Sequence, residues 1–197
     1  MQRALISSRI IKPENCVMAF GIPTTKEAFM ADQYRNDKGF AKRFNGVWER
    51  YDNEFMRYLR RCEPIYRELK VHLNYHTTLQ AFGVLFRDKK YDAIILFSHW
   101  EKARIEFFNG FAGISEVMKQ IPSGFDRFLD LCVCHPERLT IELRKNRQAC
   151  LVKYINEKTT PFIWLYFYLE LFHYLKENES TYLNALDKII EKIFTSK

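Results

Sequence analysis

The sequence predicts an α/β fold, a three-layer sandwich built around a central, mostly parallel sheet. Short apolar runs with the length of buried strands alternate with segments in which apolar residues recur every three or four positions, as on one face of a helix. With 197 residues, 47% of them hydrophobic, the chain can bury a sizeable core. No internal repeat, low-complexity segment or linker divides it, so we expect a single domain over residues 1–197.

The first half of the chain predicts two strands and two helical regions. Residues 15–21 form a short apolar run before a turn at Pro23, which indicates an early strand. Aromatic and aliphatic residues at steps of three and four predict a helix over 40–62, and we expect Pro64 to end it or to begin a second turn. Residues 71–75 are strand-like, and 77–86 predict a helix capped by one of its first two threonines.

The second half alternates more regularly between strands and helices. Residues 92–98 are a continuous apolar run, typical of a strand buried on both faces. Residues 104–110 predict a hairpin with Asn109-Gly110 as its turn. The remaining expected elements are a helix over 115–120, a strand over 128–134, a helix over 137–144 with Pro136 in its first turn, a strand over 150–154, an aromatic helix from Thr160-Pro161 to about 176, and a last helix capped by Ser180 or Thr181.

Two of these strands end on reactive residues. His99 follows the run 92–98, and Cys134 closes the strand over 128–134. Because the carboxyl ends of parallel strands form the crevice where ligands bind, the two side chains are expected to meet there as base and nucleophile. A nearby imidazole raises the thiolate fraction of a cysteine at neutral pH. The pattern therefore predicts a cysteine hydrolase, specifically a peptidase, that needs no metal or other cofactor.

Other residues near this crevice are expected to have other roles. Cys132 shares a strand face with Cys134 and is expected to be a core thiol, while His135 points away from its neighbour on an extended chain. His72 and His76 could in principle join these two cysteines in a zinc site, but their spacing matches no familiar finger.

Composition narrows the compartment and the partners. The five cysteines follow no disulfide pattern, no segment reaches the roughly 18 apolar residues of a membrane span, and the amino terminus lacks the apolar core of a signal peptide. We therefore expect a cytoplasmic protein with no membrane partner. The net charge is +7, but acidic residues interrupt the basic run between residues 35 and 70. This favours a solvated helix face over nucleic-acid binding, although a basic surface for an acidic partner or nucleic acid remains an alternative.

In order and spacing, residues 70–195 resemble a CHAT domain, a family of caspase-like cysteine peptidases related to separase and the gingipains. Four segments carry the resemblance: the strand 94–99 ending in a histidine, the hairpin and helix start 106–115, the strand 129–134 ending in a cysteine, and the strand, acidic loop and aromatic helix within 151–168. The resemblance implies a caspase-like fold with Cys134 as nucleophile and His99 as base. It also implies a role in bacterial defence or cell death and an activating partner protein.

The resemblance further implies an oxyanion hole and a substrate pocket. The oxyanion would be held by the backbone N–H groups of Cys134 and of Trp100, which stands where the family usually has glycine. Glu157 lies where relatives use a carboxylate to bind a basic P1 side chain, and Asp130 is a second acidic candidate whose depth decides its role. Because of Trp100, an inactive caspase-like fold that serves as an interaction module is the alternative.

Overall fold

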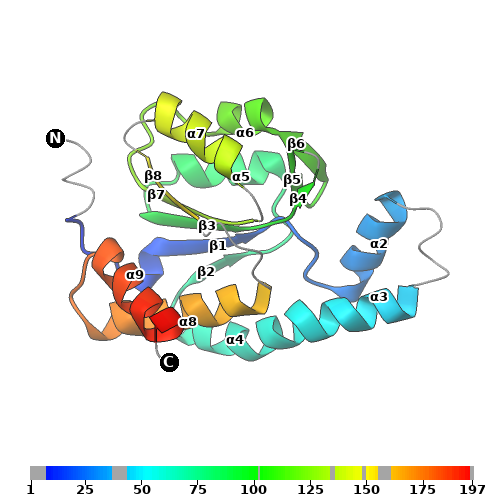
Figure 1. Cartoon of the computed structure of the whole chain (residues 1–197), viewed down its shortest axis with the longest axis horizontal. Coiled ribbons are helices and arrows are strands. Elements are labelled where there is room, and N and C mark those ends of the chain that lie inside the picture. Colours follow the sequence, from blue (N-terminus) through cyan, green and yellow to red (C-terminus); the bar gives the residue numbers. More distant parts are fainter. Residues whose placement is uncertain are drawn as a thin grey trace.

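A five-stranded sheet in which every pairing is parallel organises the chain (Figure 1). The structure is a computed structural model that describes residues 8–36, 44–101, 103–133, 136–147, 150–154 and 161–195. In spatial order the strands are β2 (His72–Asn74), β1 (Cys16–Phe20), β3 (Ala93–Phe97), β7 (Phe128–Cys132) and β8 (Leu151–Tyr154). A separate antiparallel sheet joins β4 (Trp100–Glu101), β5 (Arg104–Phe107) and β6 (Gly110–Gly113).

Helices cover both faces of the large sheet, as the sequence predicts for a three-layer arrangement (Figure 1). On one face lie α5 (Leu79–Arg87), α6 (Ile114–Gln120) and α7 (Glu137–Asn146). On the other lie α4 (Arg57–Glu68), α8 (Pro161–Glu177) and α9 (Tyr182–Ile190). Short helical turns at η1 (Pro13–Asn15) and η4 (Glu191–Thr195) complete this part of the chain. The alternation of side chains along each strand divides the core into two layers, one under each set of helices.

The strand order places a topological switch between β1 and β3. The chain leaves β1 in one direction to reach β2 and then returns to the other side of β1 to form β3. In open parallel sheets, ligands bind at such a point, outside the carboxyl ends of the strands. Beyond this edge Figure 1 shows the small sheet β4–β6 together with α2 (Lys26–Asn36) and α3 (Phe44–Tyr51). The fold therefore surrounds the edge at which β3 and β7 end.

Most elements predicted from the sequence are confirmed, including two helix starts. The Thr78 side chain accepts a hydrogen bond from the N–H of Ala81 at 3.1 Å, and Thr181 accepts one from Asn184 at 3.2 Å. Pro136 is the N-cap of α7, one position earlier than expected. Thr160 lies outside the described residues.

The prediction that Pro64 ends or restarts a helix is wrong. Pro64 lies inside α4, which continues without a break from α3 through the π-helical turn η3 (Asp52–Met56). A proline in a helix interior removes one backbone hydrogen bond and costs roughly 3 kcal/mol. The opposite face of α4 buries Leu59, Cys62 and Tyr66, and burial of such large side chains offsets a loss of that size.

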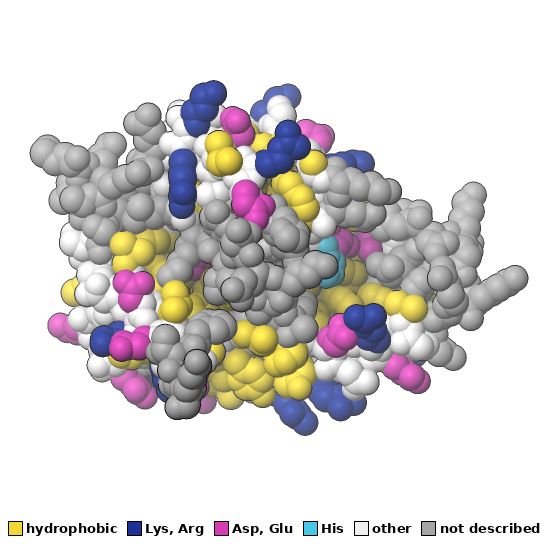
Figure 2. Space-filling model, in the orientation of Figure 1, with side chains coloured by type: hydrophobic (Ala, Val, Ile, Leu, Met, Phe, Trp, Pro, Cys, Tyr) yellow, Lys and Arg dark blue, Asp and Glu magenta, His cyan; other side chains and the backbone are white. Residues whose placement is uncertain are grey.

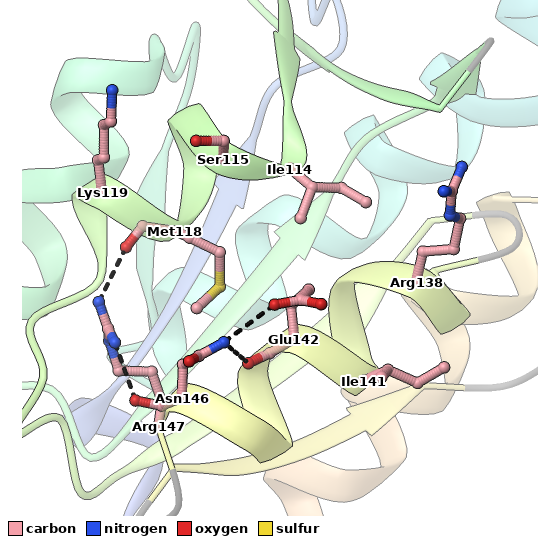
Figure 3. A pocket seen from close by; sticks show the side chains of 9 residues that line it. All are labelled: Ile114, Ser115, Met118, Lys119, Arg138, Ile141, Glu142, Asn146 and Arg147. Atoms are coloured by element: carbon pink, nitrogen blue, oxygen red, sulfur yellow. Dashed lines mark hydrogen bonds between the residues drawn. The ribbon is translucent and has the colours of Figure 1, made fainter.

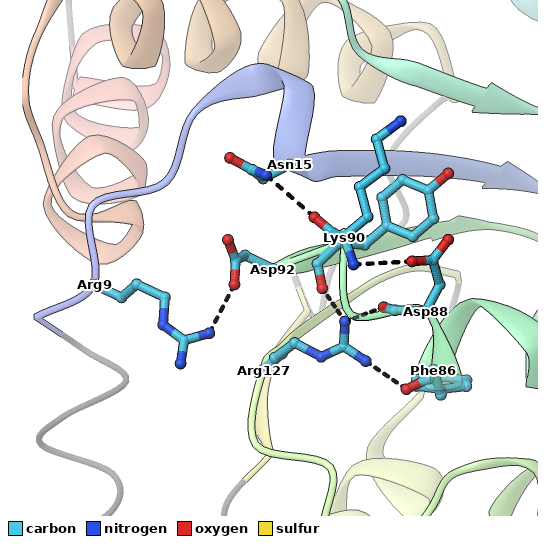
Figure 4. A network of polar contacts seen from close by, with 8 residues as sticks. Arg9, Asn15, Phe86, Asp88, Lys90, Asp92 and Arg127 are labelled. Carbon is cyan, nitrogen blue, oxygen red and sulfur yellow. Dashed lines mark hydrogen bonds and ion pairs between the residues drawn. The ribbon is translucent and has the colours of Figure 1, made fainter.

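The register between β3 and β7 is fixed at the amino-terminal edge of the sheet (Figure 4). Arg127, just before β7, donates hydrogen bonds to the backbone oxygens of Phe86, Asp88 and Tyr91 in the segment that leads from α5 to β3. The N–H of Phe128 donates to the oxygen of Asp92 at 3.0 Å, and the Asp92 carboxylate in turn pairs with Arg9 at 2.7 Å. These contacts set which residues lie opposite each other at the far end of the two strands.

Candidate active site

His99 and Cys134 each follow a pair of residues that the sheet aligns. Phe97 at the end of β3 lies opposite Cys132 at the end of β7, and the N–H of Ser98 continues the ladder to the oxygen of Cys132 at 3.2 Å. His99 comes two residues after Phe97 and is exposed. Cys134 comes two residues after Cys132 but lies outside the described residues, as does His135. β3 and β7 therefore end at the same edge of the sheet, with their last residues paired in register.

The small sheet holds the backbone of His99 in place. The oxygen of His99 accepts a hydrogen bond from the N–H of Glu106 at 3.0 Å, and the Ser98 hydroxyl donates to the oxygen of Glu106 at 2.6 Å. From the neighbouring strand, the N–H of Gly21 donates to the oxygen of Phe97 at 2.9 Å. A Cβ atom at Gly21 would lie only 2.6 Å from the Glu106 oxygen. The histidine therefore leaves β3 from a closely packed junction of three strands.

The backbone amide of Trp100 points away from its partner strand. Trp100 pairs with Ile105, while the hydrogen bond beside this pair runs from Glu106 to His99. Trp100 and Ile105 therefore form a non-hydrogen-bonded pair, in which the N–H of each residue is directed outward. Trp100 lies in an extended strand and not at positive φ, and its partly buried indole packs against the core layer under α5, α6 and α7. A tryptophan is accommodated here without the backbone conformation that favours glycine.

The prediction that Cys132 is a core thiol is confirmed. Cys132 is buried, and this burial raises the pKa of its thiol well above the ordinary value. The same desolvation raises the pKa of the Cys16 thiol. The cysteines in the described residues are all buried, and we call them the four buried cysteines: Cys16, Cys62, Cys132 and Cys150.

Asp130 belongs to the core and is not open to a substrate, which corrects its candidacy for a substrate pocket. Its side chain is 2% exposed and faces the helices α8 and α9. The hydroxyl of Tyr168 donates to Oδ2 of Asp130 at 2.9 Å, and the hydroxyl of Tyr182 donates to the same atom at 2.8 Å. Buried carboxylates require such donors, so Asp130 joins the sheet to two helices. Glu157, the other acidic candidate, lies outside the described residues.

Two acids that the structure buries were not identified from the sequence. Glu106 is 4% exposed and Asp32 is 5% exposed. Burial, followed by the charges of Glu106 and Asp32, raises the pKa of Tyr51 well above the ordinary value. The Tyr51 hydroxyl donates a hydrogen bond to the oxygen of Pro23 at 2.6 Å. Alternation along β5 puts Ile105 and Phe107 in the core and Glu106 on the opposite face, where the pattern predicts exposure. Its burial is therefore a feature of the tertiary structure that the strand pattern does not indicate.

His76, which follows β2 at the carboxyl edge of the sheet, has an unusual backbone conformation. It has a positive φ of 52°, uncommon for a residue other than glycine, and its ring stacks on Phe108 with centroids 4.4 Å apart. Strained backbone of this kind clusters at functional sites. Within the described part of the chain, no three His, Cys, Asp or Glu residues are grouped so that they could hold a metal ion.

Part of the basic run seen in the sequence is paired with acidic residues along the long helix. Three arginines pair with acids of the same helical region: Arg50 with Glu54, Arg60 with Asp52 and Arg67 with Glu63. On the face shown in Figure 2, basic side chains are interspersed with acidic ones and form no continuous stripe. This arrangement agrees with a solvated helix face.

Comparison of the chain with known protein families, curated proteins and solved structures gave no match. None of the helices in the described ranges is both long enough and apolar enough to cross a membrane.

Proposed function

We propose that this chain is a cysteine endopeptidase with a caspase-like fold related to CHAT domains. The observation that carries the proposal is the alignment of Phe97 with Cys132, which brings the residues after β3 and β7 to one edge of a parallel sheet. The histidine and the cysteine of the proposed dyad occupy equivalent positions, each two residues beyond this pair. The switch point beside β3 is where such a sheet binds ligands.

In this proposal His99 and Cys134 divide the chemistry as base and nucleophile. His99 takes the thiol proton, and the Cys134 sulfur attacks the scissile carbonyl carbon to form a tetrahedral intermediate. The intermediate collapses as the protonated His99 gives its proton to the leaving amine, which breaks the C–N bond. Water, deprotonated by His99, then attacks the thioester and releases the carboxylate product with the thiol restored. The reaction requires no metal or other cofactor.

The oxyanion of that intermediate would be held by backbone N–H groups of Trp100 and Cys134. The outward direction of the Trp100 amide, at the end of the segment that carries His99, supports this role. Preorganised donors of this kind contribute about 3–4 kcal/mol of transition-state stabilisation. Because the amide is presented by ordinary extended backbone, glycine is not required at this position.

The proposed substrate is a protein cleaved after Arg or Lys. Glu157 remains the residue that the resemblance assigns to a basic P1 side chain. Glu106, a buried acid in the strand that is hydrogen-bonded to the backbone of His99, is a further acidic residue near this edge. A positively charged side chain gains from such an environment because a desolvated carboxylate and guanidinium form strong, charge-assisted hydrogen bonds. As part of the same proposal, the protein acts in the cytoplasm in a bacterial defence or cell-death pathway, where a partner protein activates it.

An activity-based probe tests the proposal directly. An acyloxymethyl ketone carrying a P1 Arg is incubated with the full chain, and adducts are located by intact mass and peptide mapping. We expect one adduct on Cys134, lost in Cys134→Ala and His99→Ala and retained in Cys132→Ala, with folding of each variant checked by circular dichroism. Equal labelling of wild type and His99→Ala would contradict the dyad.

The second candidate is an inactive caspase-like fold used for protein interaction, and the tryptophan at position 100 is the observation that favours it. The indole is partly buried where the family usually has no side chain. This candidate predicts that wild type forms no probe adduct and that Cys134 reacts with small alkylating reagents like an ordinary thiol.

A further inference from the structure

A groove lies between α6 and α7 on the outer side of the helix layer, away from the large sheet (Figure 3). Its volume is about 660 Å³. Ile114 and Met118 of α6 and Ile141 of α7 supply its apolar lining, and the Glu142 carboxylate lies between the two helices. The cationic side chains of Lys119 and Arg138 lie at its two ends. The groove thus combines apolar side chains, one carboxylate between the helices and a positive charge at either end.

Polar side chains of α7 and of the residue that follows it make hydrogen bonds within α7 and to the end of α6, and none of these bonds involves Lys119 or Arg138. The guanidinium of Arg147 donates to the backbone oxygens of Ile121 at 2.8 Å and Met118 at 3.2 Å, which ties the end of α7 to the end of α6. The amide of Asn146 donates to the Glu142 carboxylate at 2.9 Å, so the acid that lines the groove is already engaged by its own helix. The side chains of Arg147, Asn146 and Glu142 are therefore engaged in contacts within the helix pair.

Ile141, Lys119 and Arg138, in contrast, are exposed at the groove. Ile141 is 62% exposed, although α7 buries a different face through Leu139 and Leu143. Single exposed apolar residues are common, but Ile141 lines the same groove as two partly buried apolar side chains of α6. Within the described part of the chain, neither Lys119 nor Arg138 makes an ion pair or a side-chain hydrogen bond. An apolar ligand with negative charge on both sides would complement this surface.

We propose that the groove is a docking site for an acidic amphipathic helix of another protein. Its walls are helices of 7 and 10 residues, which correspond to lengths of about 10 and 15 Å. Two to three helical turns fill that length, with one or two apolar side chains seated between Ile114, Met118 and Ile141 and acidic residues beside Lys119 and Arg138. A second copy of this chain is a poor occupant because its net charge of +7 opposes self-association.

The docking site does not depend on peptidase activity. The groove lies on α6 and α7, and its polar lining takes no part in the proposed dyad. Binding can therefore be measured in Cys134→Ala, so that a failure of the proposed chemistry leaves this proposal standing and the reverse holds as well.

The test is a selection of displayed helical peptides of about 12 residues on the full-length chain, a length that spans the groove. Enriched peptides are then synthesised with a fluorescent label and titrated by polarisation. We expect acidic sequences with apolar residues at i and i+3 or i+4. Ile141→Asp and the double variant Lys119→Glu/Arg138→Glu should each weaken binding by about tenfold or more, as for central anchor residues.

Matched controls come from the neighbouring helix α5. Val84 is exposed to a similar degree, at 58%, and Arg87 is an exposed cation at the end of α5, and neither lines the groove. Val84→Asp and Arg87→Glu should leave the affinity unchanged. Peptides in which the acids are replaced by lysine should recover binding to the double charge variant. The proposal is overturned if no acidic peptide is enriched, or if the groove variants bind as tightly as the α5 controls.

Discussion

Replacing Gly21 by alanine tests the junction that holds His99. Gly21 directly follows β1, and the new Cβ would lie 2.6 Å from the backbone oxygen of Glu106 in β5. Ordinary contact begins at 3.4 Å, so the two segments must separate by 3.4 − 2.6 = 0.8 Å. The new Cβ is attached to one backbone and meets the oxygen of another, so no flexible side chain can absorb the shift. Gly21 is also held by the hydrogen bond from its N–H to the oxygen of Phe97.

The displacement has two expected consequences. Overpacking that forces the backbone to move destabilises by about 1–3 kcal/mol. The shift also acts on β5, whose Glu106 N–H binds the oxygen of His99. Because a misplacement of about 1 Å can lower a catalytic rate by about 100-fold, we expect Gly21→Ala to slow probe labelling of Cys134 by at least about tenfold.

Urea unfolding followed by tryptophan fluorescence measures the first consequence, and Gly83→Ala is its control. A Cβ at Gly83 would also meet a close atom, at 2.3 Å, but this is the end of the flexible Gln120 side chain. Because alanine favours a helix interior by about 1 kcal/mol over glycine, Gly83→Ala should be neutral or stabilising. If Gly21→Ala were as stable as wild type, the described packing of β5 against β1 would be incorrect.

Three further predictions concern the core. Tyr182→Phe removes a hydrogen bond to the buried carboxylate of Asp130 and should lower the free energy of unfolding by about 1.5–3 kcal/mol. The control Tyr166→Phe, at an exposed position, should change it by less than about 0.5 kcal/mol. Urea titrations that give the two variants the same free energy of unfolding would refute this prediction. Burial raises the pKa values of the Cys16 and Cys132 thiols and of the Tyr182 phenol. Their contribution to stability is therefore complete at low pH and is lost as pH rises, first above about 8.5, where unfolded thiols ionise, and more steeply above about 10; a free energy of unfolding that stays flat to pH 11 would contradict it. The four buried cysteines should resist a thiol reagent such as Ellman's reagent in the native protein and react at once in denaturant, and rapid native labelling of any of them would show that its burial is wrong.

The strands β3 and β7 and their burial could be predicted because each is a short apolar run that is recognisable from its own residues. The run 92–98 became β3, a central strand with every residue buried, and 128–134 became β7 beside it. Helix caps were equally local, since Thr78 and Thr181 each bind an N–H three residues ahead. Such features depend on neighbours in the sequence, which is why the pattern alone indicates them.

What could not be predicted depends on contacts between distant segments. Glu106 is buried although alternation along β5 predicts its exposure, and the helix α2 was not predicted because it shows no strong apolar periodicity. Asp130 resembled a site residue because the predicted strand 128–134 also contains Cys132 and Cys134, but hydroxyls 38 and 52 residues away bind it in the core. Continuation of the long helix through Pro64 likewise follows from tertiary burial on its opposite face.

The measurement that tests the proposed dyad most directly is the rate of Cys134 alkylation by iodoacetamide as a function of pH, followed by peptide mass. The four buried cysteines contribute little background in the native protein. If His99 withdraws the thiol proton, the half-maximal rate in wild type should lie at least about one pH unit below that of His99→Ala. Superimposable profiles with a midpoint near about 8.5, the ordinary value for a free thiol, would contradict the dyad.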